Sequence, residues 1–325
     1  MRSITLSRDA LLALALIALI ALVYTRFPEF ASPQSLLGVF NDTSILIILA
    51  LGQMAVILTR CIDLSMASNL ALVGMCTAML NAAVPGIPVP LLIVLALVLG
   101  ALLGSINGLL VWKLDIPPIV ATLGTLTIFR GIIFLLSDGQ WVNAHEMSPA
   151  FKAFPRMELL GIPVLSWLAI MSIVCLYILL TRTPLGRAFF AVGGNPNAAV
   201  YTGIDVGRTR FNAFVLSGAL SGVAGYLWVS RYAVAYVDIA AGFELDVVAA
   251  CVIGGISIAG GMGSVAGAVL GALFLGVIKN ALPVVNISPF WQQAISGSAI
   301  IIAVVLNARS TSKRGRIILK RAEQV

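Results

Sequence analysis

The sequence predicts an all-α integral membrane protein that crosses the bilayer about ten times. Three observations lead to this fold class: the composition, the spacing of the apolar runs and the placement of the basic residues. Of the 325 residues, 60% are hydrophobic and 10% are charged, whereas soluble globular proteins carry about 25% charged residues. A chain so poor in charge cannot cover a water-facing surface, so we exclude a separate soluble domain and treat residues 1–325 as one transmembrane domain.

Apolar runs of about 20 residues, the length that crosses the hydrocarbon core, follow one another with short polar connections. We expect spans at 10–24, 44–60, 64–83, 89–112, 119–137, 163–181, 211–229, 245–260, 265–282 and 291–307. The first run has no small-residue cleavage site behind it, which favours a retained anchor over a signal peptide. The glycine-rich stretch 254–263 is either a tight turn at the membrane surface or a break inside a membrane helix. A break would need its freed backbone groups to face protein or water.

Basic residues gather on one side of this ten-span arrangement. The side that holds the N-terminus carries Arg2, Arg8, Arg60, Lys113, Arg182, Arg187, Arg208, Arg210, Arg309, Lys313, Arg314, Arg316, Lys320 and Arg321. The opposite side carries only Arg26, Lys152, Arg156 and Arg231. Because cytoplasmic loops are enriched in Lys and Arg, both termini are predicted to be cytoplasmic, with a basic tail at 308–325. The net charge of +7 is explained in this way, and no nucleic acid partner is expected.

Glycines spaced four residues apart occur in two of the apolar runs. The first set is Gly100, Gly104 and Gly108, and the second is Gly263, Gly267 and Gly271. Small residues at this spacing let two helix backbones approach closely in lipid, so both sets predict helix packing. The two sets have similar flanking residues, which indicates either an internal repeat, as in many transporters, or chance similarity between apolar segments.

The sequence offers few groups for covalent chemistry. It contains no GxxxxGK[ST] phosphate loop and no HExxH motif, and its one histidine, His145, falls in a predicted external loop. The four cysteines lack metal-ligand spacing. We therefore expect no metal site and no cofactor bound by this chain, and ATP-driven transport would need a separate ATP-hydrolysing polypeptide.

Two ionisable residues, Arg130 and Lys279, fall inside the predicted spans. A charged side chain in the hydrocarbon costs ~2.5–3.5 kcal/mol on insertion scales and usually faces a partner or water. We expect Arg130 to pair with Asp246 at the outer mouth of a solute path, and Lys279 to extend toward the membrane surface.

Polar residues in or beside the spans are candidates for the path itself. They are Gln53, Asp63, Ser65, Asn69, Asn107, Thr122 and Thr125. Such side chains hydrogen-bond either a neutral polyol or one another between helices, and the second role is the more usual one for any single residue.

The predicted internal loop 182–210 contains the signals of a short helix. Asn195 is suited to cap it, Pro196 to occupy its first turn, Ala198 and Ala199 to extend it and Gly203 to end it. A compact helix outside the bilayer suits the docking of a partner protein, and an ordinary amphipathic loop is the alternative.

Four stretches carry a resemblance to a known family: Leu58-Thr59-Arg60-Cys61-Ile62-Asp63-Leu64-Ser65, 116–126, 186–203 and 249–255. Together they resemble the permease subunits of bacterial ABC importers for ribose, rhamnose, related monosaccharides and autoinducer-2, over nearly the whole chain. Arg60-Cys61 before Ile62 and Met66-Ala67 after Ser65 look closer to the rhamnose and autoinducer-2 members than to ribose permeases.

The resemblance implies a permease of the bacterial inner membrane that pairs with a second permease subunit, identical or paralogous. A periplasmic or lipid-anchored sugar-binding protein would deliver the solute. A cytoplasmic ABC ATPase, which carries the ATP and Mg²⁺, would engage the loop. The residues implied in that contact are Gly186, Arg187, Gly193, Gly194, Asn195, Ala198, Ala199 and Gly203. The identity of the sugar stays open.

Two other classes of function remain as alternatives. An ion-coupled secondary transporter usually needs carboxylates within the membrane, whereas Asp63 and Asp246 lie near the ends of predicted spans. An intramembrane enzyme would need a nucleophile with its base, or a metal cluster, and the sequence has no motif for either.

Overall fold

The computed structural model describes residues 8–284 together with 291, 294, 297–298 and 301. The described residues form helices joined by loops, together with one small hairpin of β1 (Glu158–Leu159) and β2 (Ile162–Pro163). The long helices are α1 (Arg8–Tyr24), α2 (Pro33–Leu58), α3 (Met66–Ala83), α4 (Val89–Lys113), α5 (Pro118–Ser137), α7 (Val164–Arg182), α10 (Val206–Tyr232) and α12 (Val265–Val284). The short helices are η1 (Pro28–Ala31), α6 (Pro149–Ala153), η2 (Phe154–Arg156), α8 (Pro184–Gly194), α9 (Pro196–Tyr201) and α11 (Phe243–Ile253).

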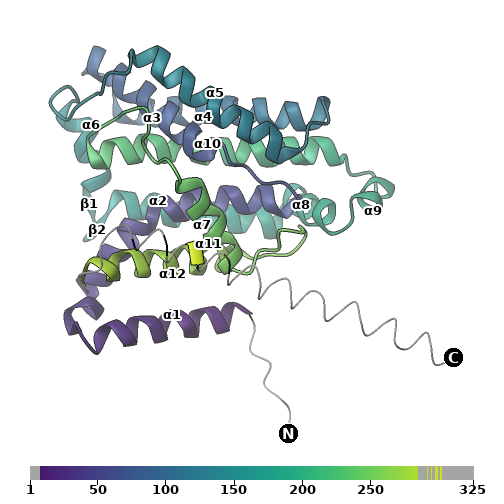
Figure 1. Cartoon of the computed structure of the whole chain (residues 1–325), viewed down its shortest axis with the longest axis horizontal. Coiled ribbons are helices and arrows are strands. Elements are labelled where there is room, and N and C mark those ends of the chain that lie inside the picture. The colour runs from purple at the N-terminus through teal and green to yellow at the C-terminus, as the bar shows by residue number, and fades with distance from the viewer. Residues whose placement is uncertain (1–7, 285–290, 292–293, 295–296, 299–300, 302–325) are drawn as a thin grey trace, which may run out of the picture.

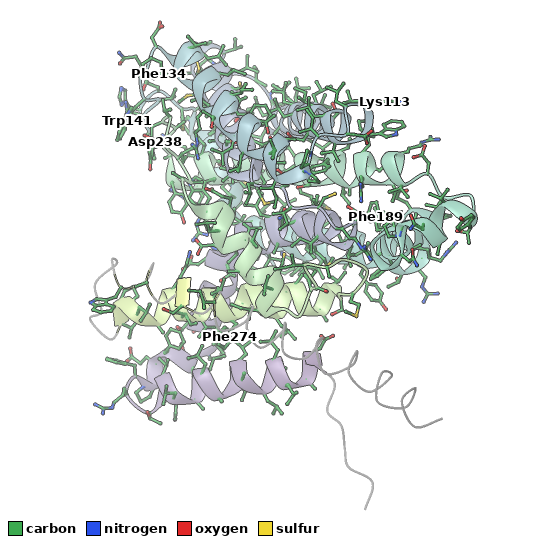
Figure 2. The ribbon with its side chains drawn as sticks, turned by 45° about the vertical axis from the view of Figure 1, so that its right-hand side comes forward. Lys113, Phe134, Trp141, Phe189, Asp238 and Phe274 are labelled. Atoms are coloured by element: carbon green, nitrogen blue, oxygen red, sulfur yellow. The ribbon has the colours of Figure 1, made fainter. Side chains whose placement is uncertain are left out.

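The long helices run side by side, and from α1 to α10 they alternate in direction (Figure 1). Their connections form two ends of the bundle, which we call the α8–α9 end and the β1–β2 end. Helices α2 and α10 lie at the centre, with α4 on the outer side of α10, and α12 followed by α1 on the outer side of α2. Figure 2 shows Lys113 and Phe189 toward the α8–α9 end and Trp141 and Asp238 at the other.

Within the described residues, seven helices are long and apolar enough to cross a membrane: α2, α3, α4, α5, α7, α10 and α12. The apolar part of α1, Asp9–Tyr24, is shorter. The prediction of a polytopic membrane protein is confirmed, whereas the count of about ten spans is not. The predicted span 291–307 and the tail 308–325 lie largely outside the described residues.

The predicted span 245–260 is wrong as a continuous helix. Helix α10 ends at the β1–β2 end and α12 begins at the α8–α9 end, so the chain between them crosses the bundle (Figure 1). Helix α11 has 11 residues and spans roughly 16 Å, about half of a ~30 Å hydrocarbon core. The rest of the crossing, 254–264, is irregular, with Gly255, Gly260 and Gly261 at φ values of 78°, 84° and 71°. The glycine-rich stretch is therefore a break inside the bundle.

The first glycine set packs α4 against α10. A Cβ atom on Gly100 would lie 2.3 Å from the carbonyl oxygen of Gly218, and one on Gly104 would lie 2.3 Å from that of Phe214. Gly108 meets the backbone and ring of Phe211. The opposite side of α4 exposes large aliphatic side chains, as lipid-facing helices do; they include Leu91, Val94, Val98 and Leu102.

The second glycine set is split between a loop and a helix. Gly267 and Gly271 of α12 lie against the end of α11, where added Cβ atoms would sit 2.2 Å from the carbonyl oxygen of Gly254 and 2.0 Å from that of Ala250. Gly263 precedes α12 and faces the side chain of Ile256. The two sets thus have different partners, and the internal repeat stays a prediction.

Helix α2 begins eleven residues before the predicted span at 44–60. Ser32 caps it by accepting a hydrogen bond from the Ser35 amide at 3.2 Å, and Pro33 occupies its first turn. From Thr43 to Leu58 every residue is buried, as expected for a helix that is apolar all round and sits in a bundle core.

Candidate functional site

A buried polar network surrounds Asp63, in the loop between α2 and α3. Its Oδ1 accepts hydrogen bonds from the amide of Ser65 at 2.9 Å and from the Ser65 hydroxyl at 2.7 Å, and its Oδ2 accepts one from Ser217 of α10 at 3.2 Å. The Gln53 side-chain amide is placed to bond both backbone polar groups of Asp63, at 3.2 and 3.3 Å. Burial raises the pKa of the Asp63 carboxyl above its ordinary value, and the bonds from Ser65 and Ser217 oppose that shift.

The network continues into α4 and α5. The Asn107 amide donates to the Ser65 hydroxyl at 2.7 Å, and Thr125 donates to the Asn107 carbonyl oxygen at 2.6 Å. Thr122 donates to the carbonyl oxygens of Pro118 at 2.9 Å and Ile62 at 3.3 Å.

Asn69 lies at the edge of the same region. Its amide donates to the Gly100 carbonyl oxygen at 3.2 Å, and its own oxygen has no partner among the described residues. The structure thus brings together most of the polar residues predicted for a solute path. They are at most 3% exposed, so in this structure their side chains join helices of one chain, and their place on a solute path stays a prediction.

A cavity of about 480 Å³ lies at the β1–β2 end, between α2, α10, α11 and α12. Three aromatic side chains, Trp228, Tyr232 and Phe243, line it together with charged and amide groups. A second cavity, of about 510 Å³, shares Trp228 and Phe243 and extends to Tyr236, Asp238 and Asp246. We call the two together the outer cavity, because the distribution of basic residues predicts that this end of the bundle faces outward.

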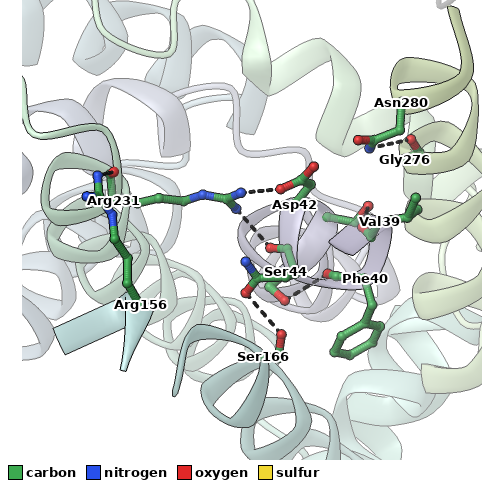
Figure 3. Close-up of polar contacts among 11 residues, drawn as sticks. Val39, Phe40, Asp42, Ser44, Arg156, Ser166, Arg231, Gly276 and Asn280 are labelled. Carbon is green, nitrogen blue, oxygen red and sulfur yellow. Dashed lines mark hydrogen bonds and ion pairs between the residues drawn. The ribbon is translucent and has the colours of Figure 1, made fainter. Parts of the chain in front are cut away.

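Four of the five charged residues of the outer cavity form two ion pairs, and Asp238 is the fifth. Arg231 forms an ion pair with Asp42 and donates a further hydrogen bond to the Asn41 carbonyl oxygen at 2.9 Å (Figure 3). Lys279 donates to Asp246 at 2.5 Å. The cavity therefore combines aromatic faces with polar groups and little net charge.

These contacts correct two predictions about ionisable residues. Asp246 pairs with Lys279, so Lys279 does not extend alone toward the membrane surface, and the predicted pairing of Asp246 with Arg130 is wrong. Arg130 instead donates to the carbonyl oxygens of Val237 at 2.5 Å and Ile239 at 2.8 Å. The guanidinium thus orders the segment 233–242 that leads into α11.

The sequence reasoning missed the pair of Asp42 and Arg231. The residues lie 189 positions apart, and Asp42 falls before the predicted start of its span. The available signal was that both residues flank apolar runs on the same predicted side of the membrane.

At the α8–α9 end the structure confirms the predicted short helix. The Asn195 side chain accepts a hydrogen bond from the Ala198 amide at 3.1 Å, Pro196 opens α9, and Gly203 follows it at a φ of 81°. Helix α8 before it was not predicted, although Thr183 caps it by accepting a bond from the Gly186 amide at 3.2 Å. The Thr183-Pro184 pair is a helix-start signal of the same kind.

The implied contact residues divide into a buried and an exposed group. Gly186, Gly193 and Ala199 are buried within the chain, whereas Arg187, Gly194, Asn195, Ala198 and Gly203 are exposed. Beside the exposed group, Tyr201 is 91% exposed and Val200 is 59% exposed. This combination leaves an apolar spot at the tip of α9.

Comparison with known proteins decides the family. Residues 35–304 match the family described as "Branched-chain amino acid transport system / permease component". The chain belongs to this permease family. It is 37% identical to the autoinducer 2 import system permease protein LsrC of Enterobacter sp. (strain 638), over 95% of this chain and 89% of that protein. It is also 37% identical to the ribose import permease protein RbsC of Bacillus subtilis (strain 168), over 92% of each chain.

The permease assignment agrees with the family resemblance predicted from the four sequence stretches. A permease is the membrane component of a transport system, which accounts for the apolar helices and for the polar cavity between them. No solved structure gives a significant match to the chain.

Proposed function

We propose that the chain is the membrane-spanning permease subunit of an ATP-driven importer that carries a monosaccharide, or a related small hydroxylated solute, into the bacterial cytoplasm. The observation that carries the proposal is the similarity, over more than nine-tenths of the chain, to permeases named for autoinducer 2 and ribose import. The residues around Ile62 favour a rhamnose-like sugar as the substrate. The chain is equally identical to the permeases named for autoinducer 2 and for ribose, so the substrate is to be determined by experiment.

The outer cavity would receive the solute. Its aromatic side chains, Trp228 and Phe243 among them, are suited to pack against the C–H faces of a sugar ring, and Asp42, Lys279 and Asn280 to bond its hydroxyl groups. Each of its two compartments falls within the ~300–1,000 Å³ range typical of small-molecule sites. Because four of its five charged residues are paired with one another, the cavity suits a neutral solute.

Each end of the bundle would bind a different partner protein. A cytoplasmic ABC ATPase, holding ATP and Mg²⁺, would dock on α8 and α9, where exposed Val200 and Tyr201 offer an apolar contact. A periplasmic or lipid-anchored sugar-binding protein would dock at the β1–β2 end, and a second permease subunit would complete the membrane part. Both chain termini would then be cytoplasmic, as the distribution of basic residues favours.

Transport assays distinguish this proposal from an ion-coupled carrier. The chain, its ATPase and its binding protein would be reconstituted in proteoliposomes, and uptake of radiolabelled ribose, rhamnose and autoinducer 2 would be measured. Uptake of one of these solutes that requires ATP and is abolished by vanadate supports the proposal. Uptake that survives vanadate and collapses with a protonophore contradicts it.

A further inference from the structure

Three segments that are distant in the sequence meet at the α8–α9 end. They are the end of α2 with residues 58–60, the end of α8 at Gly193 and Gly194, and the glycine turn 260–261 in the irregular half of the α11 crossing. The Leu58 carbonyl oxygen accepts a hydrogen bond from the Gly261 amide at 3.0 Å. We call this meeting point the glycine junction.

Arg60 joins two of these segments through its side chain. Its Nε donates to the Gly193 carbonyl oxygen at 2.7 Å, and its Nη2 donates to the Gly194 carbonyl oxygen at 2.8 Å. The last carbonyl groups of a helix lack partners within the helix, and a cation there is also favoured by the helix dipole. One guanidinium therefore caps the end of α8 from the end of α2.

The conformation of Arg60 is set for this contact. Its φ is 65°, in the left-handed region that residues other than glycine rarely occupy. A Cβ atom on Gly260 would lie 2.4 Å from the Arg60 Cγ. The arginine stem thus also packs on the glycine turn, and its single side chain contacts both α8 and the segment that continues from α11.

The backbones at the junction touch with no room for side chains. A Cβ atom on Gly193 would lie 1.7 Å from the Leu58 carbonyl oxygen and 2.3 Å from the Gly261 amide nitrogen, and one on Gly261 would lie 2.5 Å from the Gly194 amide nitrogen. Backbone atoms in van der Waals contact cannot be compressed further. A displacement of α8 toward the bundle must therefore displace the glycine turn.

Helix α11 connects the glycine turn to the outer cavity. It continues from α11, whose first residues include Phe243 and Asp246 on the cavity wall. Helix α11 is short and bounded by irregular segments on both sides, so it is able to shift as a unit without bending a long helix.

We infer that Arg60 is a positioning residue for transport, which locks α8 to the glycine turn so that movement of α8 and α9 shifts α11 and the wall of the outer cavity. The inference rests on the proposed function, in which the ATPase docks on α8 and α9. It adds the route by which nucleotide binding by the ATPase at the α8–α9 end would change the wall of the outer cavity.

The test uses the complete importer, with ATPase and binding protein, in proteoliposomes. For Arg60→Met we expect the ATPase to remain bound and to hydrolyse ATP, while solute uptake falls on the order of tenfold, within the range of typical allosteric coupling. Stimulation of hydrolysis by the solute-loaded binding protein is lost as well. Arg60→Lys should recover part of the uptake, because an ammonium group still donates to these carbonyl oxygens.

Two control variants separate the junction from general effects. Lys113→Met also removes one positive charge from an exposed site at the same end and should transport as the unsubstituted chain does. Gly193→Ala should uncouple uptake as Arg60→Met does, whereas Gly131→Ala, whose Cβ meets nothing within 4 Å, should not. Uptake by Arg60→Met at the unsubstituted rate, or loss of the bound ATPase in that variant, overturns the inference.

A distance measurement keeps the inference testable if Arg60→Met does not fold. Spin labels on the exposed positions Leu91 of α4 and Leu245 of α11 report the movement of α11 against the bundle in the chain with Arg60 intact. A shift on ATP binding supports the inference, and an α11 that stays in place contradicts it. Association of the ATPase with the unsubstituted chain tests the proposed function separately.

Discussion

Asp63 shows how a charged group is accommodated in this apolar chain. Its two oxygens receive three hydrogen bonds from Ser65 and Ser217, and through Ser65 they connect to Asn107 and Thr125. A buried polar group that loses its partner costs more than the bond itself contributes. We therefore interpret the network as what fixes α3, α4, α5 and α10 against one another.

The first prediction concerns Asn107 of α4, whose side chain bonds Ser65 before α3 and Thr125 of α5. Asn107→Leu removes one hydrogen bond from the Ser65 hydroxyl, which keeps its bond to Asp63, and one from Thr125, which keeps its bond to the Thr122 carbonyl oxygen at 3.3 Å. Because two buried hydrogen bonds are lost, the free energy of unfolding should fall by about 1–3 kcal/mol. Thermal denaturation in detergent measures the change. Ser105→Ala on the same helix is the control, because the Ser105 hydroxyl bonds only the Leu102 carbonyl oxygen at an exposed site. Equal melting temperatures for the two variants would show that the network does not hold the bundle.

The second prediction concerns the ion pair of Asp246 and Lys279. A double-mutant cycle with Asp246→Asn and Lys279→Met should give a coupling energy on the order of 1 kcal/mol, modest because the pair is partly exposed. The same cycle with Asp246→Asn and Arg130→Met should give none, since Arg130 bonds backbone oxygens instead. Coupling in the Arg130 cycle alone would contradict the observed pairing.

At the residue scale, local signals were predictable and distant partners were not. Asn195, Pro196 and Gly203 were predicted correctly, because capping depends on residues within one turn. The partners of Asp42 and Asp246 depend on which helices lie side by side. Several basic residues near span ends on the same side of the membrane were possible partners for these carboxylates. Nothing in the sequence ranked Lys279 above Arg130 as the partner of Asp246.

The packing of α4 on α10 depends on glycines that leave room for two backbones. A third prediction follows for Gly104→Ala, in which the methyl group meets the Phe214 carbonyl oxygen. Overpacking of this kind should lower stability by about 1–3 kcal/mol, despite the better helix propensity of alanine. Gly131→Ala in α5 has open space and should be neutral or stabilising by up to ~1 kcal/mol. Thermal unfolding of both variants compares them, and equal loss of stability would rule out the contact as the cause.

The tip of α9 gives a fourth prediction. Tyr201→Ala removes the most exposed aromatic side chain of the proposed docking surface. The amount of ATPase that co-purifies should fall by at least tenfold, since an anchoring aromatic contributes about 2 kcal/mol or more to binding. Leu160→Ala, at a site in the β1–β2 hairpin that is also highly exposed, should leave co-purification unchanged. If both variants retain the ATPase, the docking surface lies elsewhere.

Helix boundaries were predictable where the polarity of the chain changes sharply. The predicted spans 89–112, 119–137 and 163–181 agree with α4, α5 and α7 within one residue at each end. The start of α2 was missed because the helix continues through the polar residues Asn41 and Asp42, which are satisfied by tertiary contacts with Ser166 and Arg231. Helix α11 ends before the predicted residue 260 because Gly255 takes a left-handed φ of 78°. Gly254 also packs on Gly267 of α12, a contact that periodicity does not reveal.

On the scale of the whole molecule, the bundle has a closed core around α2 and an outer cavity bordered by a broken crossing. The fold class and the family were predictable, because composition and four short stretches carry them. The solute was not, since the cavity is assembled from α2, α10, α11 and α12, whose side chains meet only after folding. The same holds for the glycine junction, which joins residues near 60, 193 and 260.

The central claim is that α8 and α9 face the cytoplasm and receive the ATPase. Site-specific photo-cross-linking in intact cells tests it most directly, with the cross-linker placed at Tyr201 in cells that produce the complete importer. The account predicts a cross-link from position 201 to the ATPase, and none from position 160. Labelling of a cysteine at position 201 by a membrane-impermeant reagent added outside the cells, with no cross-link to the ATPase, would contradict it.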